Sequence, residues 1–248
     1  MPFIGLAFFI QLGFAIHVIK TGREIYWIYI IMFLPGIGAG LYFFTQVLPE
    51  IGQSRTVHSA KNSLIKAIDP KRELRQRKAQ LKLANTLENK LKLAEECLQA
   101  GLYEDAIELF QESLTGIGEG DPDTLLKLAQ AYFANQDYQK SLQTLDQLIE
   151  INPQYNSTDG HLLYARSLEE LGRKEKALEE YKVVAETFPG EEARVRYALL
   201  LQDQEQFAQA KALLKQVIER SKLAPKFYQK KEKHWINKAK KLLQQMEI

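Results

Sequence analysis

A pattern of small and large residues recurs four times in the second half of the chain, and it constrains the fold more than any other feature. Alanine recurs at spacings of 35, 36 and 33 residues, at Ala94, Ala129, Ala165 and Ala198. A second small residue follows twelve positions later, at Ala106, Ser141, Ala177 and Ala210. A large residue follows four positions after that, at Phe110, Leu145, Tyr181 and Leu214. This periodicity predicts a stack of structural repeats, each too small to bury its own apolar face.

The spacing within each repeat predicts two antiparallel helices. Small residues let the helices cross closely, and large ones fill the space between neighbouring repeats. Gly101 and Gly172 lie where a turn favours left-handed backbone. Pro153 and Pro189 end the second and third repeats, where a helix cannot continue. Asp121 stands before a proline and is expected to cap the next helix.

This pattern resembles the tetratricopeptide repeat family, most clearly in the second and third repeats. Position four, usually tryptophan in that family, reads Lys90, Leu125, His161 and Arg194 here. The resemblance implies an all-α fold, an α-solenoid of about four helix pairs over residues 87–221. It also implies that the first helices line a groove that binds a protein or peptide. The implied groove residues are Leu91, Glu95, Leu98, Leu126, Gln130, Phe133, Leu162, Arg166, Glu169, Val195, Leu199 and Gln202.

The composition of these groove positions narrows the expected ligand. The members of the family that clamp a peptide carboxylate use lysine and asparagine where this chain has aliphatic residues. An apolar stripe with acidic edges instead suits an amphipathic helix or an extended basic peptide. The alternative is that several of these aliphatic side chains pack within the solenoid.

Two apolar runs fill the N-terminal 50 residues. Residues 3–19 are interrupted only by Gln11 and His17, and residues 25–48 carry no formal charge. As helices they would be roughly 26 and 36 Å long, against about 30 Å for a hydrocarbon core. The runs therefore predict a transmembrane helical hairpin over residues 1–50 that contacts the lipid bilayer. Gly36 and Gly40 would let another membrane helix approach closely, and Gln11 is expected to hydrogen-bond the second run.

The stretch FLPGIGAGLYFF resembles the two-helix membrane segment that precedes phospholipase D-type domains. Pro35, Gly38 and Tyr42 carry that resemblance. It implies a shared anchor, but the His-x-Lys catalytic motif of that group does not occur in this chain. A dinucleotide-binding glycine loop is excluded, because it needs a preceding strand and a downstream acidic residue.

Charge is segregated along the sequence. Residues 51–92 carry eleven Lys or Arg against three acidic residues, residues 93–221 carry 24 acidic against 12 basic, and residues 222–248 carry eight Lys against two Glu. Residues 51–86 are therefore expected to form a basic helical connector, and both basic flanks are candidates for contact with anionic lipid. Nucleic acid is disfavoured, since no aromatic residue lies between Arg55 and Glu96.

The segment 222–248 has a helical spacing of large and small residues at Phe227, Trp235, Ala239 and Leu242. It is expected to form a basic capping helix, which a solenoid needs at its end. A helix lying on a membrane surface is the alternative.

No catalytic, metal-binding or cofactor-binding constellation is found in the sequence, and an enzyme is not expected. The four histidines His17, His58, His161 and His234 have no partner at metal-ligand spacing, and Cys97 is single. The sequence thus predicts a membrane-anchored scaffold at the cytoplasmic face of a bacterial inner membrane. A periplasmic scaffold for envelope assembly and a regulatory subunit of a membrane lipid-synthesis enzyme are the alternatives.

Overall fold

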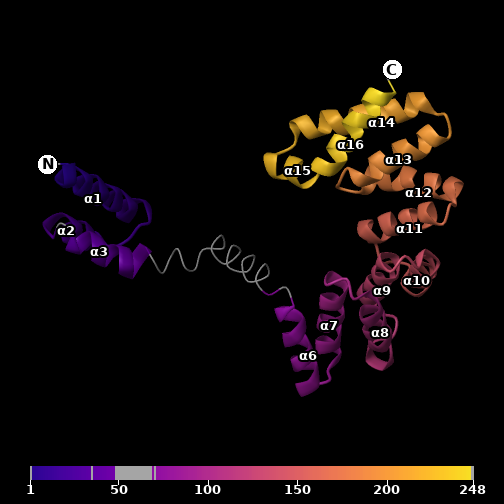
Figure 1. Ribbon diagram of the computed structural model, residues 1–248, viewed down its shortest axis with the longest axis horizontal. Helices are drawn as coiled ribbons and strands as arrows, with labels where there is room; N and C mark the ends of the chain where they lie inside the picture. Colours follow the sequence, from indigo (N-terminus) through magenta and orange to yellow (C-terminus); the bar gives the residue numbers. More distant parts are fainter. Residues whose placement is uncertain (1, 35, 48–68, 70, 247–248) are drawn as a thin grey trace. The chain divides into compact units, whose positions relative to one another are not determined.

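The computed structural model describes residues 2–34, 36–47, 69 and 71–246, with the side chains of residues 2–7 left out (Figure 1). Within these ranges the regular structure is helical and contains no strand, which confirms the predicted all-α class. The chain divides into two compact units, Met1–Arg72 and Glu73–Ile248.

The first unit contains α1 (Pro2–Lys20), α2 (Tyr26–Phe33), α3 (Ile37–Tyr42) and a π-helical turn (Phe43–Val47). Its small core consists of Val18, Trp27, Ile31 and Tyr42. As predicted, Gln11 Nε2 donates a hydrogen bond to the second apolar run, at the Ile31 carbonyl 3.1 Å away.

The predicted transmembrane hairpin is wrong. Among the described residues, no helix combines the length and the apolar character needed to cross a membrane. The second apolar run is not one helix, because α2 ends at Phe33 and α3 begins at Ile37. Gly36 lies between them with φ of 85°, which a continuous α-helix cannot contain. The multi-pass membrane location is overturned with the hairpin, and so is the anchor implied by the phospholipase D-type resemblance.

The glycines of this run differ in their surroundings. A Cβ at Gly38 would lie 2.1 Å from the Ile30 carbonyl oxygen, so α3 meets α2 closely there. A Cβ at Gly36 or Gly40 would meet nothing within 4 Å. The helix-packing role of Gly36 and Gly40 therefore stays a prediction.

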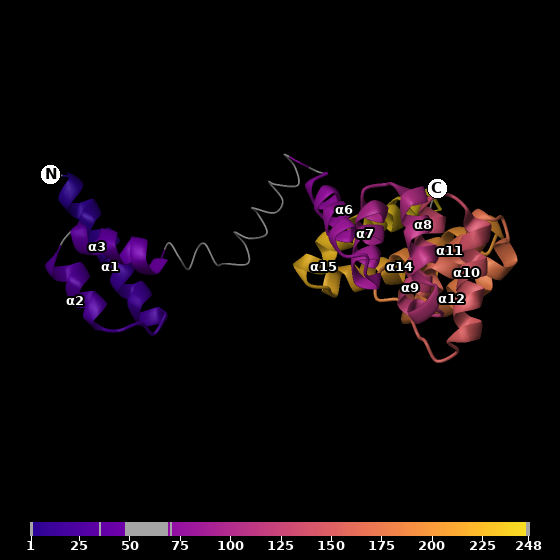
Figure 2. The ribbon, with the colours of Figure 1, turned by 90° about the horizontal axis from the view of Figure 1, so that it is seen from below.

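The second unit is a succession of helix pairs (Figure 1 and Figure 2). It begins with α6 (Arg72–Leu83), which starts at the boundary. Four pairs follow: α7 (Leu87–Gln99) with α8 (Tyr103–Ser113), α9 (Pro122–Ala134) with α10 (Tyr138–Ile151), α11 (Thr158–Glu170) with α12 (Lys174–Thr187), and α13 (Glu192–Asp203) with α14 (Phe207–Leu223). A short 3₁₀ turn, Gly116–Gly118, separates the first two pairs, and α15 (Lys226–Lys231) and α16 (Lys233–Gln245) end the unit.

The repeated residues form the core of this unit, as their spacing predicted. All four alanines of the first set are fully buried, and so are the second small residues. Phe110, Tyr181 and Leu214 are fully buried too, and Leu145 is 2% exposed. Burial of one large side chain against its neighbours contributes about 1.5–3 kcal/mol, so these positions hold the helix pairs together.

Local signals set the helix ends. The Asp121 carboxylate accepts a hydrogen bond from Thr124 N at 2.8 Å, which confirms the predicted cap of α9. Gly101 and Gly172 have φ of 77° and 70° at the turns within their repeats. Gln136 and Glu205, which are not glycines, occupy the equivalent turns with φ of 63° and 62°.

Helix α16 closes the stack. Ala239 is fully buried among Val195, Leu214 and Val217, and Trp235 and Leu242 pack at the edge of this cluster. Phe227 does not join them and is 74% exposed. Of the predicted basic connector, residues 51–68 and 70 lie outside the described residues, and the remainder contains α6.

Candidate interaction site

The twelve predicted groove residues fall into two groups in the structure. Three of the four residues at the fifth repeat position, Leu126, Leu162 and Val195, are buried in the core, and Leu91 is half-buried. These aliphatic side chains therefore pack within the solenoid, which is the alternative that the sequence left open. The other eight are half-buried and accessible, namely Glu95, Leu98, Gln130, Phe133, Arg166, Glu169, Leu199 and Gln202. Their role in binding stays a prediction.

Arg166 on α11 joins the first helices of three consecutive repeats. Its guanidinium carbon lies 4.5 Å from the centre of the Phe133 ring on α9. Its Nε lies 3.5 Å from Glu192 Oε1 on α13. A cation over an aromatic face contributes about 0.5–1 kcal/mol at a partly exposed site. Arg166 therefore links side chains of these three helices and covers the Phe133 ring.

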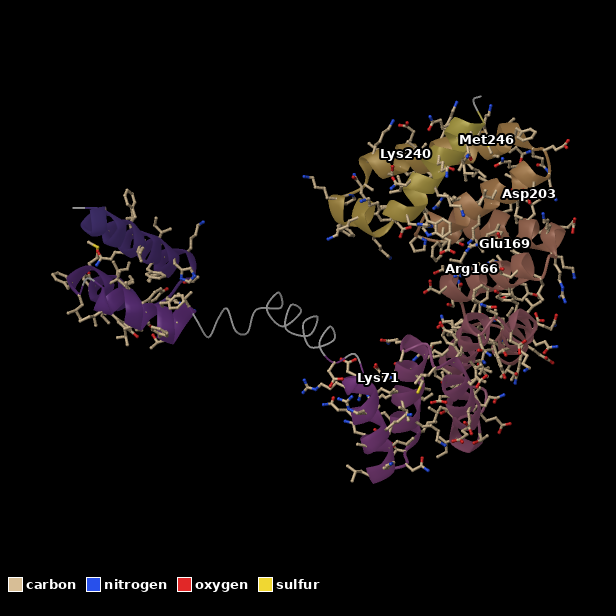
Figure 3. The ribbon with its side chains drawn as sticks, in the orientation of Figure 1. Lys71, Arg166, Glu169, Asp203, Lys240 and Met246 are labelled. Atoms are coloured by element: carbon tan, nitrogen blue, oxygen red, sulfur yellow. The ribbon has the colours of Figure 1, made fainter. Side chains whose placement is uncertain are left out.

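Arg196 on α13 continues this chain of contacts toward the C-terminal helix. Its Nη1 donates to Glu169 Oε2 at 3.0 Å, and its Nε donates to Glu192 Oε1 at 2.8 Å. Its guanidinium also lies 5.3 Å from the centre of the Trp235 ring on α16. Arg166 and Glu169 lie one turn apart on α11 (Figure 3). We call the resulting set the arginine strip: Phe133, Arg166, Glu169, Glu192, Arg196 and Trp235.

Tyr181 supports the strip from the core behind it. Its hydroxyl donates a 2.6 Å hydrogen bond to Glu169 Oε2, the oxygen that also accepts from Arg196. Burial, followed by the charge of Glu169, raises the pKa of Tyr181 far above its usual value. Burial alone would lower the pKa of Arg196, but Tyr181, Glu169 and Glu192 together raise it. The tyrosine thus stays neutral and the arginine charged at physiological pH.

Ion pairs between glutamates and basic residues change the charge that the groove is expected to present to a ligand. Glu169 and Glu192, which sit 21% and 17% exposed, each bind an arginine. Glu95 in the first repeat likewise pairs with Lys127. These carboxylates are neutralised by their own neighbours, so the acidic edge that favoured a basic peptide is not offered to a ligand. Within the strip, the rings of Phe133 and Trp235 are partly exposed beside these ion pairs.

Sequence reasoning found only part of this strip. Phe133, Arg166 and Glu169 were predicted site residues, and the structure brings them together. Glu192, Arg196 and Trp235 were missed as site residues. Arg196 directly follows the predicted Val195, so the neighbouring helix position was the available signal.

A hollow lies away from the strip, among α10, α11 and α12. Its volume is 300 Å³, and its walls include Leu148, Tyr155 and Tyr164. At its rim His161 Nε2 lies 2.7 Å from Glu180 Oε2, and the Tyr164 hydroxyl donates to Asp146 at 3.0 Å. Over the part of the chain that the structure describes, no group of three or more His, Cys, Asp or Glu could hold a metal ion.

Comparison with known proteins supports the repeat assignment. Two tetratricopeptide repeat family models match, one over residues 98–158 and the other over residues 159–190 and 192–221. No curated protein matches this chain.

Solved structures of MamA share this architecture. One crystal structure of MamA is 24% identical, covers 60% of this chain and 86% of its own, and has a TM-score of 0.52. A second MamA structure is 24% identical over 60% of this chain and 81% of its own, with a TM-score of 0.51. The MamA RS-1 ArsTM double mutant is 15% identical over 61% of this chain and 86% of its own, with a TM-score of 0.53. At this identity the likeness concerns the fold alone.

The two family models show that residues 98–190 and 192–221 of this chain are tetratricopeptide repeats.

Proposed function

We propose that this chain is a protein-interaction scaffold that binds a peptide segment along the arginine strip. The observation that carries the proposal is the unbroken set of contacts from Phe133 through Arg166 and Arg196 to Trp235. It crosses the first helices of three repeats and the closing helix, so the surface is continuous over α9, α11, α13 and α16. Arginine and large aromatic side chains are the residues most enriched among those that dominate binding energy.

The strip is also already ordered before a ligand arrives. Arg196 is hydrogen-bonded to the carboxylates of Glu169 and Glu192. Arg166 lies beside Glu192, and the Glu169 carboxylate also accepts from Tyr181. Immobilising a free arginine side chain on binding would cost about 0.5–1.5 kcal/mol, and this cost is already met in the folded chain. A preformed surface with two aromatic side chains supports binding of a segment with apolar anchors.

The proposal can be tested by selecting 12-residue peptides that bind the full chain from a displayed random library. Affinities of the selected peptides are then measured for a variant that combines Phe133→Ala with Arg166→Ala. We expect the affinity to fall by about tenfold or more, equivalent to about 1.4 kcal/mol or more. The matched control combines Val183→Ala with Lys176→Ala, because both side chains are exposed on α12.

Peptides that bind the strip should bind the control variant as tightly as the unaltered chain. Equal losses in both variants, with unchanged circular dichroism, would place binding elsewhere and contradict the proposal. The alternatives of an envelope-assembly scaffold and a subunit of a lipid-synthesis enzyme rested on the membrane anchor, and they are not carried forward.

A further inference from the structure

The C-terminal helices α15 and α16 carry a concentrated positive charge. Between residues 226 and 241 there are seven lysines, at Lys226, Lys230, Lys231, Lys233, Lys238, Lys240 and Lys241. Glu232 is the single acidic residue in this stretch, and it is only 7% exposed. None of the seven lysines forms an ion pair with a carboxylate of the described residues.

This charge adjoins the arginine strip. The Trp235 ring has the Arg196 guanidinium 5.3 Å from its centre and the Lys238 ammonium 5.2 Å from it. Lys238 follows Trp235 by three residues and lies about 60° around α16 from it, and Lys241 lies about 60° further around the helix toward solvent. The apolar end of the strip therefore leads onto lysines, of which Lys238 is half-buried and Lys241 is exposed.

The lysines are held on a fixed surface. Ala239 anchors α16 in the core beside Leu214 and Val217, and Ile236 is buried as well. The Tyr228 hydroxyl ties α15 to the segment between α12 and α13, where it donates to Glu191 Oε1 at 2.8 Å or to the Pro189 carbonyl at 2.9 Å. The helices that bear these lysines are therefore fixed to the solenoid before a ligand binds.

We infer that the segment bound on the strip carries apolar side chains followed by a cluster of acidic residues, with the acidic end on Lys238 and Lys241. This inference rests on the proposed function. It adds the chemical character of the bound segment and the end of the strip at which its acidic residues lie. Opposite charges at an interface set the direction of a ligand and exclude ligands of the wrong sign. An acidic segment meets unpaired lysines there, whereas a basic one would be repelled.

A peptide matches this surface better than a nucleic acid does. A phosphate chain laid along the strip would pass Glu169 and Glu192 before it reached the lysines. Nucleic-acid binding requires a basic groove that follows the backbone over its length, and here the basic part occupies one end.

The test uses two fluorescent peptides with the same leucine- and phenylalanine-containing half, one ending in four glutamates and the other in four lysines. Fluorescence anisotropy with the full chain should show about tenfold tighter binding of the acidic peptide at low salt. The preference should shrink as salt is added, because exposed charges are screened. Equal affinity for the two peptides, or no binding of the acidic one, would overturn the inference.

Charge reversal on the cap identifies the lysines involved. Combining Lys238→Glu with Lys241→Glu should remove the preference for the acidic peptide. The matched control combines Lys176→Glu with Lys182→Glu on α12, which changes the net charge by the same amount at exposed positions. An equal effect of both pairs would show a general charge effect and reject the assignment to α16.

The outcomes separate this inference from the proposed function. If both peptides bind and depend on Phe133 but not on Lys238 and Lys241, the strip binds peptides and the acidic-end inference fails. If neither peptide depends on Phe133 or Arg166, the proposed function fails. A single-stranded DNA of equal charge that binds more tightly than the acidic peptide would mark a general polyanion surface and overturn the inference.

Discussion

At the residue scale, one position in each repeat has left-handed backbone between its two helices. Gly101, Gln136, Gly172 and Glu205 occupy it, with φ between 62° and 77°. An L-residue pays roughly 1–2 kcal/mol for this conformation, and glycine does not. The second and fourth repeats therefore carry strain that the first and third avoid.

Replacing Gly172 with alanine should lower the free energy of unfolding by roughly 0.5–1 kcal/mol. The backbone penalty is partly offset because alanine restricts the unfolded chain more than glycine does. A Cβ at this position would meet nothing within 4 Å, so the expected loss comes from the backbone alone. The change would be measured by urea unfolding followed by circular dichroism.

Gln136→Ala provides the control for this prediction. Glutamine and alanine are both L-residues with a Cβ, so the backbone penalty at the φ of 63° seen for residue 136 is expected to be the same in both proteins. Its unfolding free energy should stay within about 0.5 kcal/mol of the unaltered value, as for other exposed substitutions. A loss at Gln136 as large as that at Gly172 would show that side-chain contacts, not backbone strain, decide these turns.

At the scale of helices, the spacing of buried residues predicted the repeats well, because each of Ala94, Phe110 and their counterparts must face the core. The arginine strip could not be predicted in the same way. Arg196 pairs with Glu169, 27 residues earlier in another repeat, and only the packing of α11 against α13 brings them together. From the sequence alone, the charge of Glu169 is expected to be available to a ligand, whereas in the folded chain Arg196 neutralises it.

The prediction for the N-terminal apolar run failed for a different reason. Hydropathy over residues 25–48 suggested one long helix, since it reports composition and not backbone continuity. Gly36, with φ of 85°, separates α2 from α3, and Gly38 lets the two helices meet. Pro35 in the sequence predicts a kink or local break of such a helix, whereas Gly36 and Gly40 predict helix pairing and give no sign that the break falls at Gly36.

The attachment of α15 and α16 depends on a buried polar contact that can be tested. Glu232 Oε2 accepts a hydrogen bond from the backbone N–H of Glu191 at 3.0 Å, and Glu191 is fully buried. Glu232→Ala should lower the free energy of unfolding by about 1–3 kcal/mol, because it leaves that N–H without a partner. The loss would be measured by urea unfolding of the full chain.

Two further variants make this prediction specific. Glu232→Gln keeps an acceptor oxygen and should recover most of the loss. Glu219→Ala removes an exposed carboxylate paired with Lys222 and should cost less than about 1 kcal/mol. A Glu232→Ala protein as stable as the Glu219→Ala protein would show that the contact contributes nothing to the attachment.

At the scale of the whole molecule, three tyrosines link stability to alkaline pH. The pKa of Tyr155, Tyr164 and Tyr228 is raised in each case from 10.0 to about 12, first by burial and then by hydrogen bonds to Asp123, Asp146 and Glu191. A tyrosine whose pKa is raised on folding holds its proton more tightly in the folded chain. Its contribution is fully present below pH 10, the unfolded value, and is lost as the pH rises through about 12.

The unfolding free energy should therefore fall between pH 10 and about 12, beyond any change seen from pH 8 to 9. A variant with Tyr155, Tyr164 and Tyr228 all changed to Phe removes these three groups from the titration. It should be less stable than the unaltered chain at pH 8, since three hydrogen bonds are lost, but its stability should fall less steeply above pH 10. Urea midpoints measured for both proteins at pH 8, 10 and 11 would test this. Parallel curves for the two proteins would mean that other groups govern the alkaline transition, because the hydrogen bonds alone shift a curve without changing its slope.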